Sequence, residues 1–170
     1  MSRAVPRTGL AMAAWLFVAD QITKWIVVGP LGLYYLGAVR RIAPFFDLRF
    51  VQNIGVSLGL LRAETELARW GLVAMTGLIA IGVLMWMWRE KNRADQLALG
   101  MVLGGALGNI VDRVRLGYVI DFADLHFGEW RPFLVFNVAD AAITIGVLIL
   151  LVRALLMRDK PGKPVEKFNA

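Results

Sequence analysis

Two aspartates in apolar surroundings are the residues of this sequence best suited to chemistry. Asp121 lies in the segment Val119-Ile120-Asp121-Phe122, and Asp140 lies in Val138-Ala139-Asp140-Ala141. An apolar environment disfavours a charged carboxylate, and two carboxylates that share a site can hold one proton between them. One member then acts as a base on water while the protonated member polarises a carbonyl group, without a metal or a covalent intermediate. The two residues therefore predict hydrolysis by an aspartate pair.

Other charged residues in apolar segments have structural interpretations that compete with catalysis. Asp20 and Lys24 are four residues apart, a spacing at which an ion pair forms on one face of a helix. Asp112 is followed by Arg113. An ion pair between these two, fixing the end of a helix, is favoured over catalysis because charges at membrane depth are usually paired.

The remaining polar and small residues are interpreted as packing or surface positions. Asp124 is expected to be a solvated residue at the membrane interface. The spacing from Gly104 to Gly108 lets helices approach closely, and Gly105 and Gly108 could also admit a peptide backbone. The asparagines can hydrogen-bond between helices: Asn53, Asn109 and Asn137.

The segment Gly55-Val56-Ser57-Leu58-Gly59 matches the G-x-S-x-G pattern of serine hydrolases. That pattern needs a strand–turn–helix elbow and a histidine base, and His126 is the single histidine of the sequence. A serine hydrolase is therefore disfavoured, and the substitution Ser57→Ala separates it from an aspartate mechanism.

The composition is that of a membrane protein. Hydrophobic residues make up 58% of the 170 residues, against roughly 45–50% in soluble domains, and the mean hydropathy is +0.62. The net charge of +6 comes from basic residues beside apolar runs, which indicates topology signals and anionic lipid contacts rather than nucleic-acid binding. With no cysteine and one histidine, thiolate chemistry is excluded and a zinc site, or any other metal cofactor, is not expected.

Four apolar stretches approach the ~20 residues that a bilayer core requires. We expect spans at about 9–28, 67–88, 96–114 and 136–156, within one domain of residues 1–170. Residues 29–66 contain an approximately alternating run at 45–52, which predicts a small extramembrane β element between the first two helices. Residues 115–135 are an aromatic interfacial connection, and residues 158–170 are a mobile basic tail. The predicted fold class is therefore a mainly α membrane protein with four transmembrane helices.

Helix direction predicts where the polar groups meet. Basic residues in the short loop at 89–93 and after the fourth span put both termini in the cytoplasm. With that topology, six polar groups lie at one level, near the outer membrane face: Asp20, Asn53, Asp112, Asp121, Asn137 and Asp140.

Five blocks of this sequence, taken together, resemble the lipoprotein signal peptidase (signal peptidase II) family. They occur in the family's order from the first span to the fourth, and the last three form a highly specific set. The blocks are Asp20-Gln-Ile-Thr-Lys24, Asn53-Ile-Gly55-Val-Ser57, Gly104-Gly-Ala-Leu-Gly108-Asn-Ile-Val-Asp112-Arg113, Val119-Ile-Asp121-Phe122 and Phe136-Asn137-Val-Ala139-Asp140.

The resemblance implies an intramembrane aspartic endopeptidase of the bacterial inner membrane. It implies cleavage of prolipoproteins before a cysteine that carries diacylglycerol, a catalytic pair at Asp121 and Asp140, a periplasmic β-cradle, and inhibition by globomycin-type peptides. A monomer in contact with membrane lipids is expected. Residues that support the site or hold substrate map onto Asp20, Asn53, Gly105, Asn109, Asp112, Arg113, Asn137 and Ala139.

Ile54 and Leu58 depart from the family pattern, which often has threonine and phenylalanine there. The departures put a hydrogen bond from position 54 and a ring contact from position 58 in doubt.

Two other classes compete. A proton-coupled transporter needs a polar path to the inner face, but residues 82–88 and 96–103 carry almost no polar groups. A non-catalytic scaffold predicts that both Asp121 and Asp140 can be replaced without loss of function.

Overall fold

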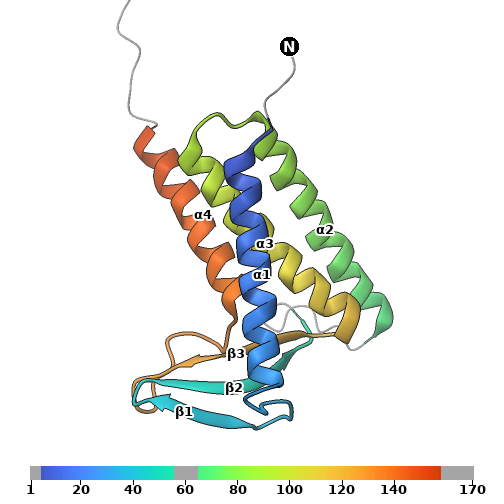
Figure 1. Cartoon of the computed structure of the whole chain (residues 1–170), viewed down its shortest axis with the longest axis vertical. Coiled ribbons are helices and arrows are strands. Elements are labelled where there is room, and N and C mark those ends of the chain that lie inside the picture. The colour runs from blue at the N-terminus through green and yellow to red at the C-terminus, as the bar shows by residue number, and fades with distance from the viewer. Residues whose placement is uncertain (1–4, 56–64, 158–170) are drawn as a thin grey trace, which may run out of the picture.

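The bundle and sheet of this protein are seen in a computed structural model that describes residues 5–55 and 65–157. Within these residues the chain forms four helices, each long and apolar enough to cross a membrane: α1 (Arg7–Val28), α2 (Glu66–Arg89), α3 (Arg93–Leu116) and α4 (Val138–Met157). The start of α1 and the end of α4 lie at the same end of the bundle, and the sheet lies across the other end (Figure 1). The predicted fold class is confirmed.

Capping residues, rather than the limits of its apolar run, determine where α3 begins and ends. The Asn92 side chain accepts hydrogen bonds from the backbone N–H groups of Ala94 and Asp95 and starts α3. At the other end Gly117 adopts a φ of 86°, the left-handed conformation that glycine favours after a helix. The helix therefore runs three residues earlier and two residues later than the apolar stretch at 96–114.

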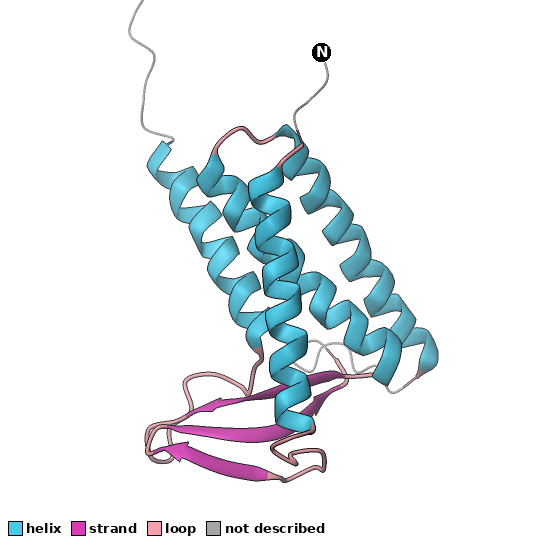
Figure 2. Ribbon diagram, in the orientation of Figure 1, coloured by secondary structure: helices cyan, strands magenta, loops and turns pink. Residues whose placement is uncertain are grey.

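The three strands of the described chain are β1 (Val39–Ala43), β2 (Phe46–Asn53) and β3 (Val119–Leu125), and they pair antiparallel in the order β1-β2-β3. Figure 2 shows them as one layer beneath the helices. The run at 45–52 predicted β2, and the β1–β2 pair confirms the small β element expected within residues 29–66, but the position of β1 and the whole of β3 were not predicted. β3 is buried on both faces except at Leu125, and β1 is exposed on both faces except at Ala43, so neither strand shows the alternation that identifies a half-buried strand.

Helix α3 is the centre of the bundle. Two thirds of its apolar stretch is buried, whereas at most 28% is buried in the other three helices. Small residues permit this packing, because a methyl group added at Gly104 would lie 2.5 Å from the backbone oxygen of Ala13 on α1. The expected close approach of helices at this glycine is confirmed.

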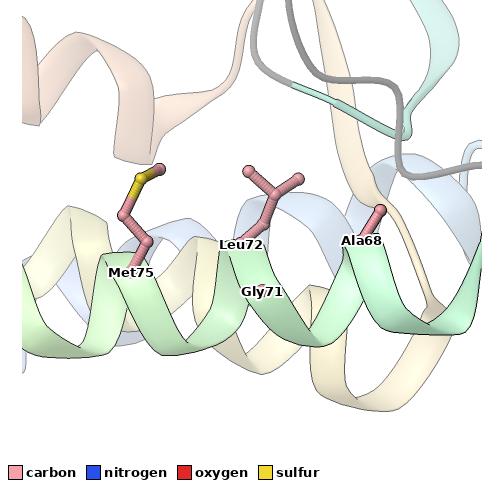
Figure 3. Close-up of a pocket in the computed structure, with 4 residues that line it drawn as sticks. All are labelled: Ala68, Gly71, Leu72 and Met75. Carbon is pink, nitrogen blue, oxygen red and sulfur yellow. The ribbon is translucent and has the colours of Figure 1, made fainter.

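Helix α2 carries an apolar cavity on its half nearest the sheet. The cavity has a volume of about 180 Å³ and is lined by Ala68, Gly71, Leu72 and Met75. Figure 3 shows the side chains of Ala68, Leu72 and Met75 pointing from one face of α2 in the same direction.

The packing at Gly104 yields a stability prediction. Replacement by valine should lower the free energy of unfolding by about 1–3 kcal/mol, because the added carbons collide with the backbone of α1. Thermal unfolding of the purified protein in detergent measures the effect. Gly82→Val on α2 is the matched control, because nothing lies within 4 Å of a Cβ there. Equal melting temperatures for the two variants would contradict the packing argument.

Candidate active site

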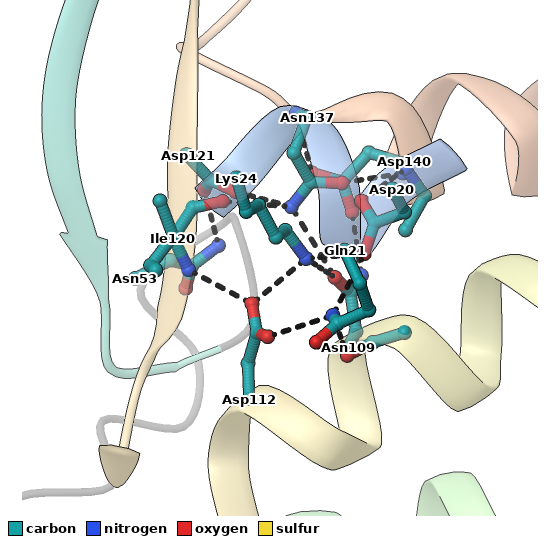
Figure 4. A network of polar contacts seen from close by, with 12 residues as sticks. Asp20, Gln21, Lys24, Asn53, Asn109, Asp112, Ile120, Asp121, Asn137 and Asp140 are labelled. Atoms are coloured by element: carbon teal, nitrogen blue, oxygen red, sulfur yellow. Dashed lines mark hydrogen bonds and ion pairs between the residues drawn. The ribbon is translucent and has the colours of Figure 1, made fainter. Parts of the chain in front are cut away.

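Polar side chains from three helices and two strands meet at the sheet end of the bundle. Figure 4 shows that Asp20 comes from α1, Asp112 from α3, Asp121 from β3 and Asp140 from the first turn of α4. The six polar groups expected at one level, Asn53 and Asn137 included, belong to one connected network of hydrogen bonds and ion pairs.

Lys24 is the buried cation of this network. Its ammonium nitrogen lies 2.7 Å from Asp20 Oδ2 and 2.7 Å from Asp112 Oδ2, and it donates to Asn109 Oδ1 at 3.2 Å. The side chain of Lys24 is only 3% exposed. The predicted Asp20–Lys24 ion pair is confirmed, and the same lysine also joins α1 to α3.

The predicted pairing of Asp112 with Arg113 is wrong. Within the described chain the ion pair of Asp112 is with Lys24, and Arg113 Nη2 donates to the backbone oxygen of Gly55 at 3.1 Å. Adjacent residues of a helix project in different directions and do not face each other. A sequence neighbour was therefore the wrong partner to choose.

The carboxylate of Asp112 also holds the start of β3. Asp112 Oδ2 accepts from the backbone N–H of Ile120 at 3.2 Å, and Oδ1 accepts from Gln21 Nε2 at 3.0 Å. The sequence does not single out Gln21, because Gly108 and Asp112 lie on α3 and its partner on α1, Asp20, is only its immediate neighbour.

The start of α4 holds Asp140 in a reciprocal cap. Asn137 Oδ1 accepts from the backbone N–H of Asp140 at 2.9 Å, and Asp140 Oδ2 accepts from the backbone N–H of Asn137 at 3.3 Å. This is the geometry of a capping box, here with Asn and Asp. Asp20 Oδ1 accepts from the N–H of Ala139 at 3.0 Å. The N–H groups at the helix start therefore determine where the Asp140 carboxylate lies.

Two amide side chains hold the carboxylate of Asp121. Asn137 Nδ2 donates to Oδ1 at 2.6 Å, and Asn53 Nδ2 donates to Oδ2 at 3.0 Å. β2–β3 pairing sets Val51 opposite Asp121 and Asn53 opposite Val119, which makes Asn53 a diagonal neighbour of Asp121 on the same face. Both carboxylate oxygens are therefore oriented by groups from separate elements.

The two aspartates differ in their environment. Asp121 is 2% exposed, whereas Asp140 is half-buried and accepts from Asn109 Nδ2 at 2.9 Å. Burial, together with the negative charge of Asp140, raises the pKa of Asp121 from 3.8 to about 7, against the opposing effects of Asn53, Asn137 and Lys24. A proton held by Asp121 and an accessible carboxylate at Asp140 suit an acid–base pair.

Gly105 and Ala139, the remaining two predicted supporting residues, set the distance between α3 and α4 beside the aspartates. A Cβ at Gly105 would lie 2.5 Å from the backbone oxygen of Ala139. Close backbone contact, rather than admission of a foreign peptide, explains this glycine. Gly108 likewise leaves room for the Asp20 carboxylate, because a Cβ there would lie 2.5 Å from Asp20 Oδ2.

The expectation that Asp124 is solvated is wrong. Its exposure is 0%, and it forms ion pairs with Arg49 at 2.9 Å and Arg131 at 3.2 Å. The two arginines come from separate segments: Arg49 lies on β2, and Arg131 lies in the connection that follows β3.

The structure describes the histidine of the alternative serine site but not its serine. His126 is buried with Nε2 3.3 Å from Asp47 Oδ2, while Ser57 lies outside the described residues. Within residues 5–55 and 65–157, no group of three His, Asp or Glu residues is placed to hold a metal ion.

Comparisons with known proteins agree on one family. Residues 12–156 match the family model described as signal peptidase (SPase) II. The lipoprotein signal peptidase of Rhizorhabdus wittichii is 58% identical, with 95% of this chain and 93% of that protein covered. That of Sphingopyxis alaskensis is 55% identical, with 92% and 90% covered. A bacterial membrane enzyme structure determined in meso at 2.3 Å resolution is 28% identical, covers 94% of both chains and gives a TM-score of 0.79.

The position of Lys24 yields a second stability prediction. Lys24→Met should lower the free energy of unfolding by about 3–5 kcal/mol, because Asp20 and Asp112 then lack their buried counter-charge. The melting temperature in detergent measures the loss. Arg40→Met, on the exposed strand β1, removes a positive charge from the surface and should leave the melting temperature nearly unchanged. A Lys24→Met protein as stable as wild type would show that the ion pairs are dispensable.

Proposed function

The chain belongs to the signal peptidase II family, and on that premise we propose that Asp121 and Asp140 are its catalytic pair. It is a multi-pass membrane protease that cleaves signal peptides from prolipoproteins. The observation that carries the proposed pair is the position of Asn137. Its side chain donates to Asp121 at 2.6 Å and its backbone N–H donates to Asp140 at 3.3 Å, so one residue joins both carboxylates.

In the proposed mechanism Asp140 is the base and Asp121 holds the proton. Asp140 is the more accessible carboxylate, and donors from Asn109 and the start of α4 stabilise negative charge on it. Asp140 takes a proton from water as the water attacks the scissile carbonyl carbon, while protonated Asp121 donates a hydrogen bond to the carbonyl oxygen. The proton gained by Asp140 then passes to the leaving nitrogen as the peptide bond breaks.

The supporting residues have separate tasks in this proposal. Asn53 and Asn137 orient Asp121, and Asn109 orients Asp140. Asp20 and Asp112 fix α4 and β3 through backbone N–H groups. Arg113, which holds the backbone oxygen of Gly55, also has donors suited to a carbonyl of bound substrate. Gly105 and Ala139 hold the helices at the required spacing.

The substrate proposed for this site is a prolipoprotein that carries diacylglycerol on the cysteine after the cleaved bond. Such a substrate is already in the bilayer, and the apolar cavity on α2, lined by Ala68, Gly71, Leu72 and Met75, suits part of an acyl chain (Figure 3). Globomycin-type peptides would compete for the same place. The protein would act as a monomer among lipids of the bacterial inner membrane, with cytoplasmic termini and the site near the periplasmic face.

Substitution of either aspartate tests the catalytic pair. Asp121→Asn and Asp140→Asn should each lower kcat for a diacylated prolipoprotein by at least about 10²-fold, because each removes one half of the acid–base pair. Each variant is purified in detergent and incubated with the substrate, and cleavage is measured as a gel shift of the substrate. Thermal unfolding shows whether each variant is folded. Asp95→Asn, which breaks an ion pair with Arg153 between α3 and α4, is the control and should retain activity. Robust turnover by either site variant refutes the assignment.

The raised pKa of Asp121 predicts the alkaline limb of the pH profile. As pH rises through about 7, Asp121 loses its proton and can no longer donate to the carbonyl oxygen, so kcat/KM should fall about tenfold per pH unit. The raised pKa also makes the contribution of this carboxyl to stability decrease as pH rises from about 4 to about 7. Melting temperatures over the same range therefore control for unfolding. Constant kcat/KM to about pH 9 would contradict the assigned role of Asp121.

A further inference from the structure

A buried carboxylate next to the site has no part in the proposed chemistry. Asp124 lies three residues after Asp121 on β3 and is 0% exposed. Its Oδ2 lies 2.9 Å from Arg49 Nε on β2, and its Oδ1 lies 3.2 Å from Arg131 Nε on the 126–137 connection, which runs from β3 to α4. One carboxylate therefore ties together two strands and the segment that leads to Asp140.

The end of the connection is hydrogen-bonded to β3. The N–H of Ala123 donates to the backbone oxygen of Phe136 at 2.7 Å, and the N–H of Phe136 donates to the oxygen of Ala123 at 3.1 Å. Asn137 follows at once and donates to Asp121 at 2.6 Å. Because Asn137 also forms the cap with Asp140, the position of the connection on β3 sets the position of both carboxylates.

The strand register explains why Asp124 needs positive partners. β2–β3 pairing puts Asp47 directly opposite Asp124, and both residues are buried. Like charges facing each other across a strand pair are destabilising. Arg49 and Arg131 compensate Asp124, while His126 lies 3.3 Å from Asp47. Asp47 also has Arg41 Nε at 3.7 Å from its Oδ1, so each of the two facing carboxylates has an arginine partner of its own, and Arg131 is the partner of Asp124 that comes from outside the sheet.

We propose that Asp124 is a positioning residue for signal peptide cleavage: its ion pair with Arg131 holds the 126–137 connection on β3 and so fixes Asn137 and Asp140 relative to Asp121. This inference rests on the proposed catalytic pair. It assigns Asp124 no contact with substrate, so kcat should depend on it more strongly than KM.

The decisive variant is Arg131→Gln, because the Arg131 side chain is 43% exposed and the buried Asp124 carboxylate keeps its ion pair with Arg49. On a diacylated prolipoprotein, kcat should fall roughly 10- to 100-fold, the cost of a small displacement of catalytic groups, with KM within about twofold. The alkaline limb of the pH profile should move to lower pH, because the charge of Asp140 then lies farther from Asp121. Unchanged kcat and pH profile would overturn the proposal.

Two further variants separate positioning from folding. Arg131→Lys keeps the positive charge and should retain more than half of wild-type kcat, whereas a loss equal to that of Arg131→Gln overturns the ion-pair argument. Asp124→Asn should lower kcat at least as much as Arg131→Gln. If the loss of kcat in Arg131→Gln merely follows a lower folded fraction in thermal unfolding, the residue is structural and the proposal fails.

Two controls in the same assay keep this inference distinct from the proposed function. Asp95→Asn breaks the Asp95–Arg153 ion pair and should leave kcat unchanged. Asp121→Asn should be inactive. An active Asp121→Asn protein refutes the catalytic pair itself, whereas an inactive one beside a fully active Arg131→Gln protein refutes only the positioning role.

Discussion

The ion pairs of buried Lys24 are the interaction on which the site depends. One ammonium group lies between Asp20 and Asp112, each at 2.7 Å. These two carboxylates then extend to other elements, Asp20 to the N–H of Ala139 on α4 and Asp112 to the N–H of Ile120 on β3. A single lysine therefore connects α1, α3, α4 and β3, and through these elements it helps to fix the positions of Asp121 and Asp140. Burying three charges is costly, and the cost is offset because each carboxylate also accepts backbone or amide hydrogen bonds.

Small residues make this arrangement possible. Gly104 lets α1 approach α3, and Gly105 lets α4 approach from another side of the same helix. Without side chains at these positions, the carboxylates and asparagines of three helices come within hydrogen-bonding distance of one another. The glycines thus act on the site only by reducing the distances between the helices. This explains why α3, an apolar helix with many glycines, is the buried centre of the bundle.

The parts of the site that local spacing determines were predictable, and those that depend on distant contacts were not. Asp20 and Lys24 face each other because they are four residues apart on one helix. The partners of Asp112, Arg113 and Asp124 come from other elements, and no sequence pattern indicates them. The same reasoning applies to the fold. Long apolar runs identified the four helices, but β3 is buried on both faces and its sequence lacks the alternation of a half-buried strand.

A protease in a membrane must keep one carboxyl dry and still admit water, and the ends of the spans meet both demands. β3 belongs to the sheet beyond the helices, yet its burial keeps Asp121 at 2% exposure. Asp140 lies in the first turn of α4, half-buried, where backbone N–H groups stabilise negative charge. A carboxylate in mid-span would lack water, and one on a solvated loop would lose the desolvation that raises the pKa of Asp121. The boundary between helix and sheet therefore gives the proposed catalytic aspartates the unequal environments that an acid–base pair needs.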